Sequence, residues 1–294
     1  MIQYLLRQIL TTANDLTPEF PVMALELRRI KGDIPRLKRD GRRIVWLPTV
    51  IAVPVGLANS LGVEGSFRVA EQAGQVILAL IVLSLTLMLA VNTISVLNTV
   101  AIFSDEIRHG AWDILQLTNV NPQFVLEAKY VGAQLRLWWP TCLEISLRAV
   151  TIALASAPLV VAFLLQTNTW FGTNLLSILL IGFLTSIYIF EPFWRMRMIA
   201  ALGLALAAFV RRASDGMLIG MIFILAISLM QLGALVAIII VREVSLQSGF
   251  VFQCFVPMVL IIIFMVSGHV YTFVRYRSLE FTLRRAFQPE VRDS

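Results

Sequence analysis

Residues 75–103 read QVILALIVLSLTLMLAVNTISVLNTVAIF, a run of 29 residues without a charge, a glycine or a proline. A transmembrane α-helix needs about 20 apolar residues to cross the hydrocarbon core of a bilayer, which is about 30 Å thick. At a rise of about 1.5 Å per residue, this run is longer than the core requires. It therefore predicts a membrane helix that tilts in the bilayer or extends into water.

The composition of the whole chain points to the same class of protein. Hydrophobic residues make up 58% of the 294 residues, charged residues make up 14%, and the mean hydropathy is +0.82. A typical soluble domain is about 45–50% apolar and about 25% charged. A soluble particle of this composition would lack the polar surface to cover itself, so the sequence predicts an all-α polytopic membrane protein.

Uncharged runs and the turn-forming residues between them predict six transmembrane helices. The predicted spans are residues 44–63 and 75–103, a hairpin between Arg148 and Glu191 that is interrupted at 166–174, and residues 216–241 and 250–274. Residues 191–212 have two interpretations: a continuation of the fourth span that is broken at Pro192, or a separate element. We prefer the first interpretation because it keeps the number of spans even.

Basic residues gather on one side of these predicted spans. The chain has 24 Lys and Arg residues, of which nine precede residue 44, three lie in 104–138, four lie in 191–213 and five follow residue 274. Such an excess is typical of the cytoplasmic side. We therefore expect a multi-pass protein of the cell inner (plasma) membrane with both termini in the cytoplasm.

This orientation divides the chain into three parts. Residues 1–43 are expected to form a cytoplasmic N-terminal segment with an amphipathic interfacial helix, residues 44–275 the membrane domain, and residues 276–294 a cytoplasmic tail. The net charge of +6 suits anionic membrane lipid as a partner better than nucleic acid, because the basic residues follow the membrane boundaries. Nucleic acid is therefore not an expected partner.

Catalytic and metal-binding motifs are absent from the sequence. It contains no GxxxxGK[ST] phosphate-binding loop, no HExxH zinc helix and no GxSxG nucleophile elbow. The two histidines, His109 and His269, are far apart in the sequence. We expect neither an enzyme nor a metal site, and no cofactor bound by this chain.

The longest polar connection between two predicted spans is SDEIRHGAWDILQLTNVNPQFVLEAK, residues 104–129. Trp112 and Leu115 are apolar, whereas Glu106, Arg108 and Asp113 are charged, as in a short helix with a partly apolar face. Two interpretations follow from this pattern. The segment is either an interfacial helix on the lipid headgroups or a helix that docks on a partner protein.

The order of residues in this segment resembles a motif of ABC-2 type ABC transporter permeases. The resemblance rests on Glu106, Arg108, Gly110, Trp112, Asp113, Leu115, Leu117, Thr118 and Lys129. The sequence PVMALELRR, with Pro21, Glu26, Arg28 and Arg29, is similar to the connecting helix before the first span of that family. Ala201, Leu202 and Gly203, followed by Arg211, resemble its motif at the end of the fourth span. The chain departs from the family pattern at Ala111, Asn119, Ala128 and Ala207.

The resemblance implies a permease subunit that forms a membrane path and acts mainly as an exporter. Residues 104–129 would contain a cytoplasmic coupling helix that docks a separate ATPase subunit, and ATP and Mg would bind to that partner. The permease would pair with a second copy of itself or with a related permease. The alternatives are an ATP-independent secondary transporter and a membrane assembly subunit that transports nothing.

Several polar and small residues within the spans have two possible roles. Ser84, Met88, Asn92, Ser95 and Thr99 share one helical face, which either lines a pathway or makes hydrogen bonds between helices. The segment around Arg28 and Arg29 either anchors the chain to the membrane or packs on the ATPase.

Charged pairs and glycines in the spans are also informative. Glu144 with Arg148, and Glu191 with Arg195, have i,i+4 spacing, so we expect each pair to neutralise itself, for a structural role or for gating or substrate contact. Gly216 and Gly220 form a GxxxG pattern that permits close helix approach, for example in a dimer.

Overall fold

The computed structural model describes Ile9 and residues 34–61, 66–108, 122–165, 171–210, 212–248 and 250–287. Among these residues the chain is all-helical, with no strand. The helices are α3 (Ile34–Leu61), α4 (Ser66–Arg108), α6 (Pro122–Leu165), α7 (Phe171–Phe209), α8 (Ala213–Ser248) and α9 (Phe250–Phe287). The segments predicted as the N-terminal interfacial helix and the coupling helix lie outside the described residues.

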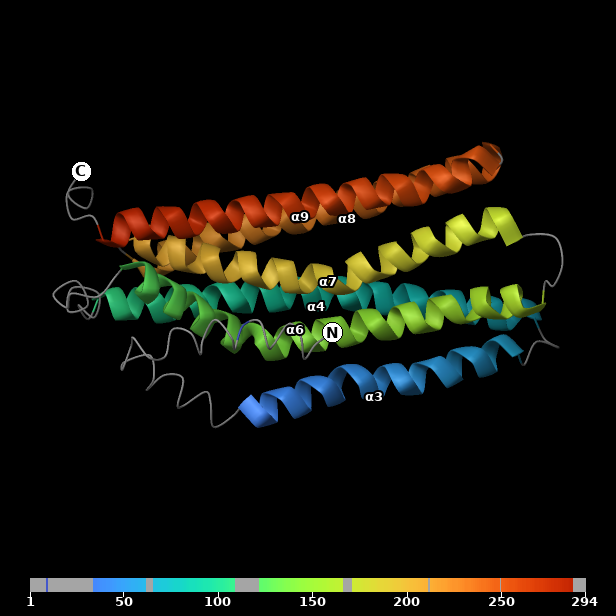
Figure 1. Ribbon diagram of the computed structural model, residues 1–294, viewed down its shortest axis with the longest axis horizontal. Helices are drawn as coiled ribbons and strands as arrows, with labels where there is room; N and C mark the ends of the chain where they lie inside the picture. The colour runs from blue at the N-terminus through green and yellow to red at the C-terminus, as the bar shows by residue number, and fades with distance from the viewer. Residues whose placement is uncertain are drawn as a thin grey trace.

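The six helices run lengthwise through an elongated bundle, and consecutive helices point in opposite directions (Figure 1). One end of the bundle holds the C-terminal ends of α4, α7 and α9. Each predicted span falls largely within one of these helices, and the helices are longer than the spans. α3 runs across residue 43 and α9 across residue 275, so neither predicted domain boundary is the end of a helix.

Two of the described helices are long and apolar enough to cross a membrane. The qualifying segments are Val82–Ile107 of α4 and Thr185–Phe209 of α7. Shorter apolar segments occur at Arg43–Pro54 of α3 and Ala213–Leu229 of α8. This finding gives weak support to association with a membrane.

Residues 191–209 belong to the same helix as the residues before them. α7 continues through Pro192, so neither a separate element nor a break in the helical assignment occurs here. Proline removes one backbone hydrogen bond and crowds the preceding turn, which kinks a helix without necessarily ending it. Figure 1 shows that α7 changes direction near its middle. The helix ends at Phe209, and the amide N–H groups of Asp215 and Gly216 then bond to the carbonyl oxygen of Arg212 where α8 begins.

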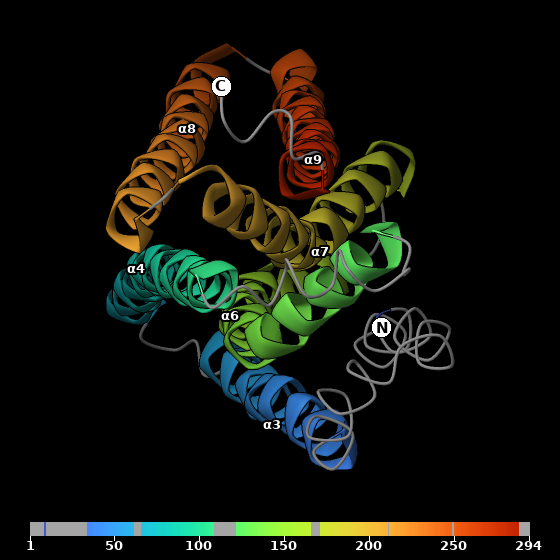
Figure 2. The same cartoon turned by 90° about the vertical axis from the view of Figure 1, so that its left-hand side faces the viewer.

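α7 is the central helix of the bundle. Figure 2 shows it surrounded by α4, α6, α8 and α9, whereas α3 lies at the periphery against α6. The second half of α7, from Met198 to Ala207, is buried along nearly its whole circumference. Gly203 lies so close to Thr99 of α4 that a Cβ atom built on it would be 2.6 Å from a carbon of that side chain.

The glycines of the GxxxG pattern permit a close contact inside the chain. Gly216 and Gly220 of α8 pack against Val100 and Val96 of α4, where an added Cβ atom would meet the valine side chains. In this structure the pattern brings α8 close to α4. The physical basis is the one expected from the sequence, because small residues let two helix backbones approach closely.

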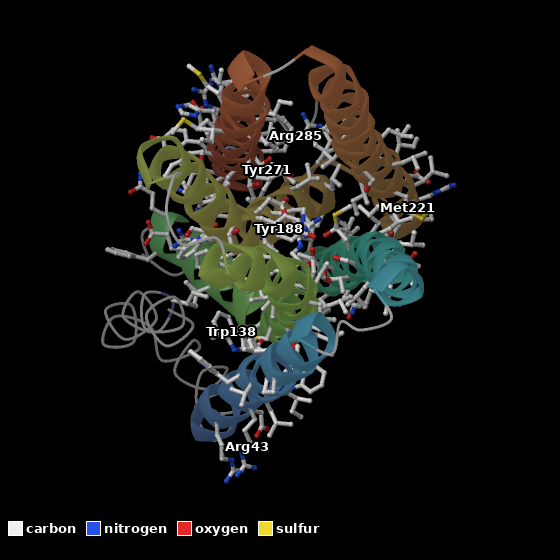
Figure 3. All side chains as sticks on the ribbon, turned by 90° about the vertical axis from the view of Figure 1, so that its right-hand side faces the viewer. Arg43, Trp138, Tyr188, Met221, Tyr271 and Arg285 are labelled. Carbon is white, nitrogen blue, oxygen red and sulfur yellow. The ribbon has the colours of Figure 1, made fainter. Side chains whose placement is uncertain are left out.

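Several polar side chains lie within a mainly apolar core, and large apolar side chains face outward on the peripheral helices. On α4, Ser84 and Asn92 are each 3% exposed, whereas Val82 and Ile94 are 56% and 54% exposed. Large apolar side chains are also exposed on the other peripheral helices, including Trp46, Leu47, Leu218, Ile222, Met265 and Val266. Figure 3 shows Tyr188 and Trp138 inside the bundle and Met221 at its edge.

Candidate functional site

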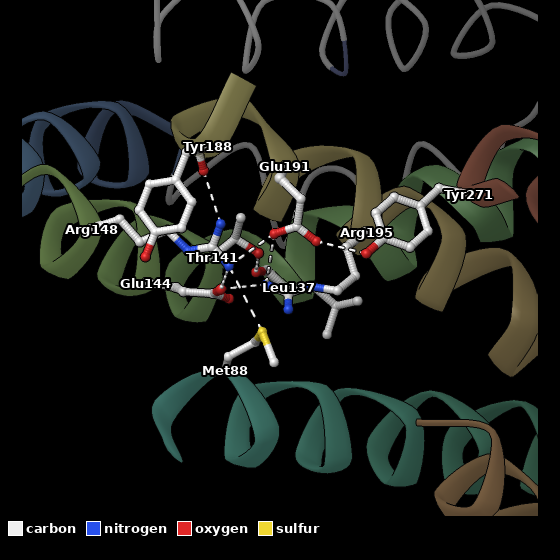
Figure 4. Close-up of polar contacts among 9 residues, drawn as sticks. All are labelled: Met88, Leu137, Thr141, Glu144, Arg148, Tyr188, Glu191, Arg195 and Tyr271. Atoms are coloured by element: carbon white, nitrogen blue, oxygen red, sulfur yellow. Dashed lines mark hydrogen bonds and ion pairs between the residues drawn. The ribbon is translucent and has the colours of Figure 1, made fainter. Parts of the chain in front are cut away.

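A cluster of four charged side chains lies inside the bundle, near the middle of α6 and α7. α6 contributes Glu144 and Arg148, and α7 contributes Glu191 and Arg195 (Figure 4). Each of these residues is at most 4% exposed, and none of their side chains is more than 5% exposed. The helical spacing of four residues places both members of each pair on the same face, and the contact between α6 and α7 brings the two faces together.

The close ion pairs of the cluster include one within α6 and two that cross between α6 and α7. Arg148 Nη2 lies 2.7 Å from Glu144 Oε1 and 2.8 Å from Glu191 Oε2. Arg195 Nη2 also pairs with Glu144 Oε1, but it lies 3.6 Å from Glu191 Oε2 on its own helix. The expectation that each pair neutralises itself therefore holds for Glu144 with Arg148 and is incomplete for Glu191, whose nearer arginine comes from α6.

Three further residues, on α4, α7 and α9, contact the charge cluster. Tyr271 of α9 donates a hydrogen bond of 2.8 Å to Glu191 Oε1 and is 1% exposed. Arg148 donates to the backbone oxygen of Tyr188 at 2.8 Å, and its guanidinium lies 4.5 Å from the centre of the Tyr188 ring. Arg148 also lies 3.8 Å from the sulfur of Met88 on α4. Four helices thus meet at one polar centre.

Charge balance explains how this cluster is tolerated in the interior. Two carboxylates face two guanidinium groups, so the formal charges cancel. Isolated buried charges are costly to desolvate, and the cost is offset only when opposite charges and hydrogen bonds surround them. Two donors, Arg148 Nε and Arg195 Nη1, are buried without an acceptor. They are available to a water or to another oxygen if the helices move.

The polar stripe predicted on α4 faces the interior of the bundle. Ser84, Met88, Asn92, Ser95 and Thr99 are each at most 4% exposed. Met88 reaches the charge cluster, and the Thr99 hydroxyl donates to the backbone oxygen of Ser95 at 2.7 Å. A small cavity of about 120 Å³ lies between α4 and α6 and is lined in part by Ser95 and Thr99. Both interpretations of the stripe, pathway lining and helix packing, fit this position.

Glu106 and Lys129 form a contact at the end of the bundle that holds the C-terminal ends of α4, α7 and α9. We call it the basic end, because Arg284 and Arg285 lie in the last turn of α9. Glu106 is near the end of α4 and Lys129 is in the first turns of α6, and their side chains pair at 2.8 Å. The exposed fractions of these side chains are 24% for Glu106 and 16% for Lys129. This ion pair joins the C-terminal end of α4 to the first turns of α6. The coupling role of Glu106 stays a prediction, and in the structure its carboxylate pairs with the neighbouring helix.

Most other residues of the predicted coupling and connecting segments are outside the described part of the chain. They are Gly110, Trp112, Asp113, Leu115 and Thr118, together with Pro21, Glu26, Arg28 and Arg29. Arg108 is described only as the last residue of α4.

A second polar contact joins the helices nearer the basic end. The hydroxyl of Tyr130 on α6 donates to the backbone oxygen of Arg197 on α7 at 3.3 Å. Burial raises the pKa of Tyr130 above its usual value, although Arg275 and Arg197 act in the opposite direction. This contact therefore adds a polar link between α6 and α7 on the basic side of the charge cluster.

Sequence reasoning missed two contributors to the charge cluster. Tyr271 and Tyr188 lie in apolar runs. A tyrosine in such a run indicates a buried polar contact, because a buried hydroxyl usually finds a hydrogen-bond partner. The sequence offers no way to choose that partner. Among the described residues, no group of three or more His, Cys, Asp or Glu side chains has the arrangement of a metal site.

Comparisons with protein-family models, curated proteins and solved structures found no match to this chain. Its function must therefore be argued from its own residues and geometry.

Proposed function

We propose that this chain is a six-span permease subunit of an ATP-driven ABC transporter of the ABC-2 type, and that it is an exporter. The observation that carries the membrane part of the proposal is the combination of buried charges inside the bundle and large apolar side chains exposed on its surface. The charges of Glu144, Arg148, Glu191 and Arg195 are inside, and large apolar side chains such as Ile222 and Val266 are outside. Large apolar side chains exposed on several helices are typical of contact with lipid or with another membrane helix.

The proposed location is the inner (plasma) membrane of the cell. In this orientation the basic end of the bundle, which holds the C-terminal ends of α4, α7 and α9, faces the cytoplasm. Arg277, Arg284 and Arg285 lie in the C-terminal part of α9, and Arg212 directly precedes α8, which begins at this end. Basic residues favour the cytoplasmic side because they are retained there during insertion and meet anionic lipid. Both termini are cytoplasmic in this arrangement.

Coupling to ATP hydrolysis is assigned to residues 104–129. In our proposal Trp112 and Leu115 fill a groove on a separate ATPase subunit, while Arg108 and Asp113 orient the segment. The ion pair between Glu106 and Lys129 supports this role because it fixes the two ends of the segment relative to each other. Movement of the ATPase would then pass directly into α4 and α6. ATP and Mg would bind to the ATPase, and a second permease copy or a related permease would complete the path.

One observation favours ATP-independent secondary transport as a second candidate. Charged residues inside a membrane domain often mark ion or proton pathways, and Glu144 and Glu191 lie inside the bundle. The full set of paired arginines argues for a structural role, because each carboxylate already has a cationic partner. A non-transporting assembly subunit would use the same cluster only for packing.

A purification experiment tests the proposal and separates these candidates. The full chain is isolated from native membranes in a mild detergent, its co-purifying chains are identified by mass analysis, and ATP hydrolysis is measured. We expect a separate ATPase subunit to co-purify with the wild type and to be lost with Trp112→Ala, because an aromatic anchor often dominates a protein interface.

The matched control is Trp46→Ala, which removes an exposed tryptophan from α3. This variant should retain the ATPase. Retention of the ATPase by Trp112→Ala would refute the docking assignment. A chain that carries no ATPase but transports in response to a pH gradient, and loses that activity with Glu144→Gln, would instead establish secondary transport.

A further inference from the structure

An amphipathic groove lies between the C-terminal ends of α7 and α9. Its volume is about 440 Å³, within the range of about 300–1,000 Å³ that is typical of small-ligand sites. Its apolar part is formed by Ala205, Leu206, Phe209 and Phe281, and its polar part by Arg277, Ser278, Glu280 and Arg284. Figure 1 shows these two helix ends side by side at the basic end of the bundle.

The polar part of the groove carries more positive than negative charge. Glu280 pairs with Arg277 at 3.3 Å and with Arg284 at 2.6 Å, so one carboxylate serves two guanidinium groups. The arginine side chains remain 66% and 67% exposed. Arg285 lies over the ring of Phe209 at 5.7 Å and adds a third positive charge beside the groove. Each guanidinium has five N–H donors in a planar fork that matches the oxygens of a phosphate group.

The surroundings of the groove suit the depth of lipid headgroups. The predicted sixth span ends at residue 274, directly before the groove residues of α9. Phe273 and Tyr276 are 62% and 69% exposed on the outer surface of α9. Exposed aromatic residues are typical of the boundary between the hydrocarbon core and the headgroups.

We propose that this groove binds an anionic phospholipid of the cytoplasmic leaflet. The phosphate contacts Arg277 and Arg284, and the first part of an acyl chain lies along Leu206, Phe209 and Phe281. The groove is too small for a whole phospholipid, so the acyl chains continue over the exposed apolar surface of α9. This inference rests on the membrane orientation of the proposed function and is independent of the coupling to an ATPase.

Native mass spectrometry of the full chain in a neutral detergent tests this site. Phosphatidylglycerol and phosphatidylcholine with identical acyl chains are supplied in equal amounts, and the ratio of the two retained lipids is measured. We expect the wild type to retain phosphatidylglycerol preferentially. The double variant Arg277→Gln/Arg284→Gln should lower the preference about 25-fold, because each basic residue near an anionic headgroup contributes a factor of about five.

A second variant gives the opposite effect and excludes misfolding as the explanation. Glu280→Gln removes the carboxylate that competes with the phosphate, so the preference for phosphatidylglycerol should increase. Arg39→Gln is the control, because Arg39 is an exposed arginine paired with an acid on α3. It should leave the lipid ratio unchanged.

Two outcomes would overturn the lipid site. The first is a lipid ratio that is the same in the wild type, in Glu280→Gln and in the double variant. The second is loss of a dimer in the double variant without a change in the lipid ratio, which would make the groove a contact between copies. Neither outcome depends on an ATPase, so failure of the lipid site and failure of the coupling assignment are separate results.

Discussion

The buried charge cluster and the arginine–glutamate group of α9 use the same side chains at similar distances. Arg148 lies 2.8 Å from Glu191 in the cluster, and Arg284 lies 2.6 Å from Glu280 on α9. Arg148 and Glu191 are 5% and 4% exposed, whereas Arg284 and Glu280 are 67% and 33% exposed. Distance alone therefore does not distinguish the two regions, and burial does.

The difference in burial predicts a difference in energetic consequence. An exposed ion pair contributes about 0–1 kcal/mol, because water and salt screen it and its side chains lose conformational entropy. Removal of one partner from a buried group leaves an uncompensated charge in the interior and costs about 3–5 kcal/mol. The cluster should therefore control the stability of the fold, whereas the group on α9 remains free to interact with a ligand.

The largest expected effect follows loss of a buried carboxylate. Glu191→Ala leaves two arginines with one glutamate in the interior, so we expect the free energy of unfolding to fall by about 3–5 kcal/mol. Unfolding by sodium dodecyl sulfate in mixed micelles measures this change.

Glu280→Ala is the matched control, because Glu280 also contacts two arginines but lies at the surface. Its cost should stay below about 1 kcal/mol. Equal losses for the two variants would remove the distinction between the buried cluster and the surface group.

A smaller effect is expected for the hydrogen bond between α9 and the cluster. Tyr271→Phe keeps the ring and removes the hydroxyl that donates to Glu191 Oε1. A hydrogen bond to a charged group contributes about 1.5–3 kcal/mol, so we expect destabilisation of that size in the same unfolding measurement.

Tyr276→Phe provides the comparison on the same helix, because Tyr276 is 69% exposed. It should be nearly neutral. A neutral Tyr271→Phe variant would mean that α9 contributes packing, rather than charge stabilisation, to this centre.

The smallest effect is expected at the exposed arginine of α9. Arg284→Gln breaks a short ion pair of 2.6 Å, yet the free energy of unfolding in a detergent without anionic lipid should change by only about 0.5 kcal/mol or less. When the same unfolding measurement is repeated at high salt, the difference in free energy of unfolding between Arg284→Gln and the wild type should be no larger than the experimental error. A loss of 2 kcal/mol or more, on the order expected for the buried group, would show that surface charge holds α9 in place.

The charge cluster shows how far helical spacing can predict a site. The i,i+4 pattern identified Glu144 with Arg148 and Glu191 with Arg195, because four residues complete about one helical turn. It did not predict that the two pairs would merge, because the sequence does not specify which faces of α6 and α7 meet. The contact of Arg148 with Glu191 depends on the packing of helices that are far apart in the sequence.

The GxxxG pattern illustrates the same limit in an apolar region. The sequence indicated that another helix can approach Gly216 and Gly220 closely, since neither residue has a side chain beyond Cα. It left the identity of that helix open. The structure places Val96 and Val100 of α4 against these glycines.

The sequence by itself determined the helical fold class, the approximate positions of the long helices and the gathering of basic residues at predicted helix ends. These features follow from local properties, namely the length of apolar runs, the period of the helix and the distribution of charge. Tertiary structure decided that the α4 stripe faces inward, that α7 passes through Pro192 without ending, and that Tyr271 completes the charge cluster. The physical reason is that helix packing depends on the shapes of surfaces from distant segments, which local patterns do not encode.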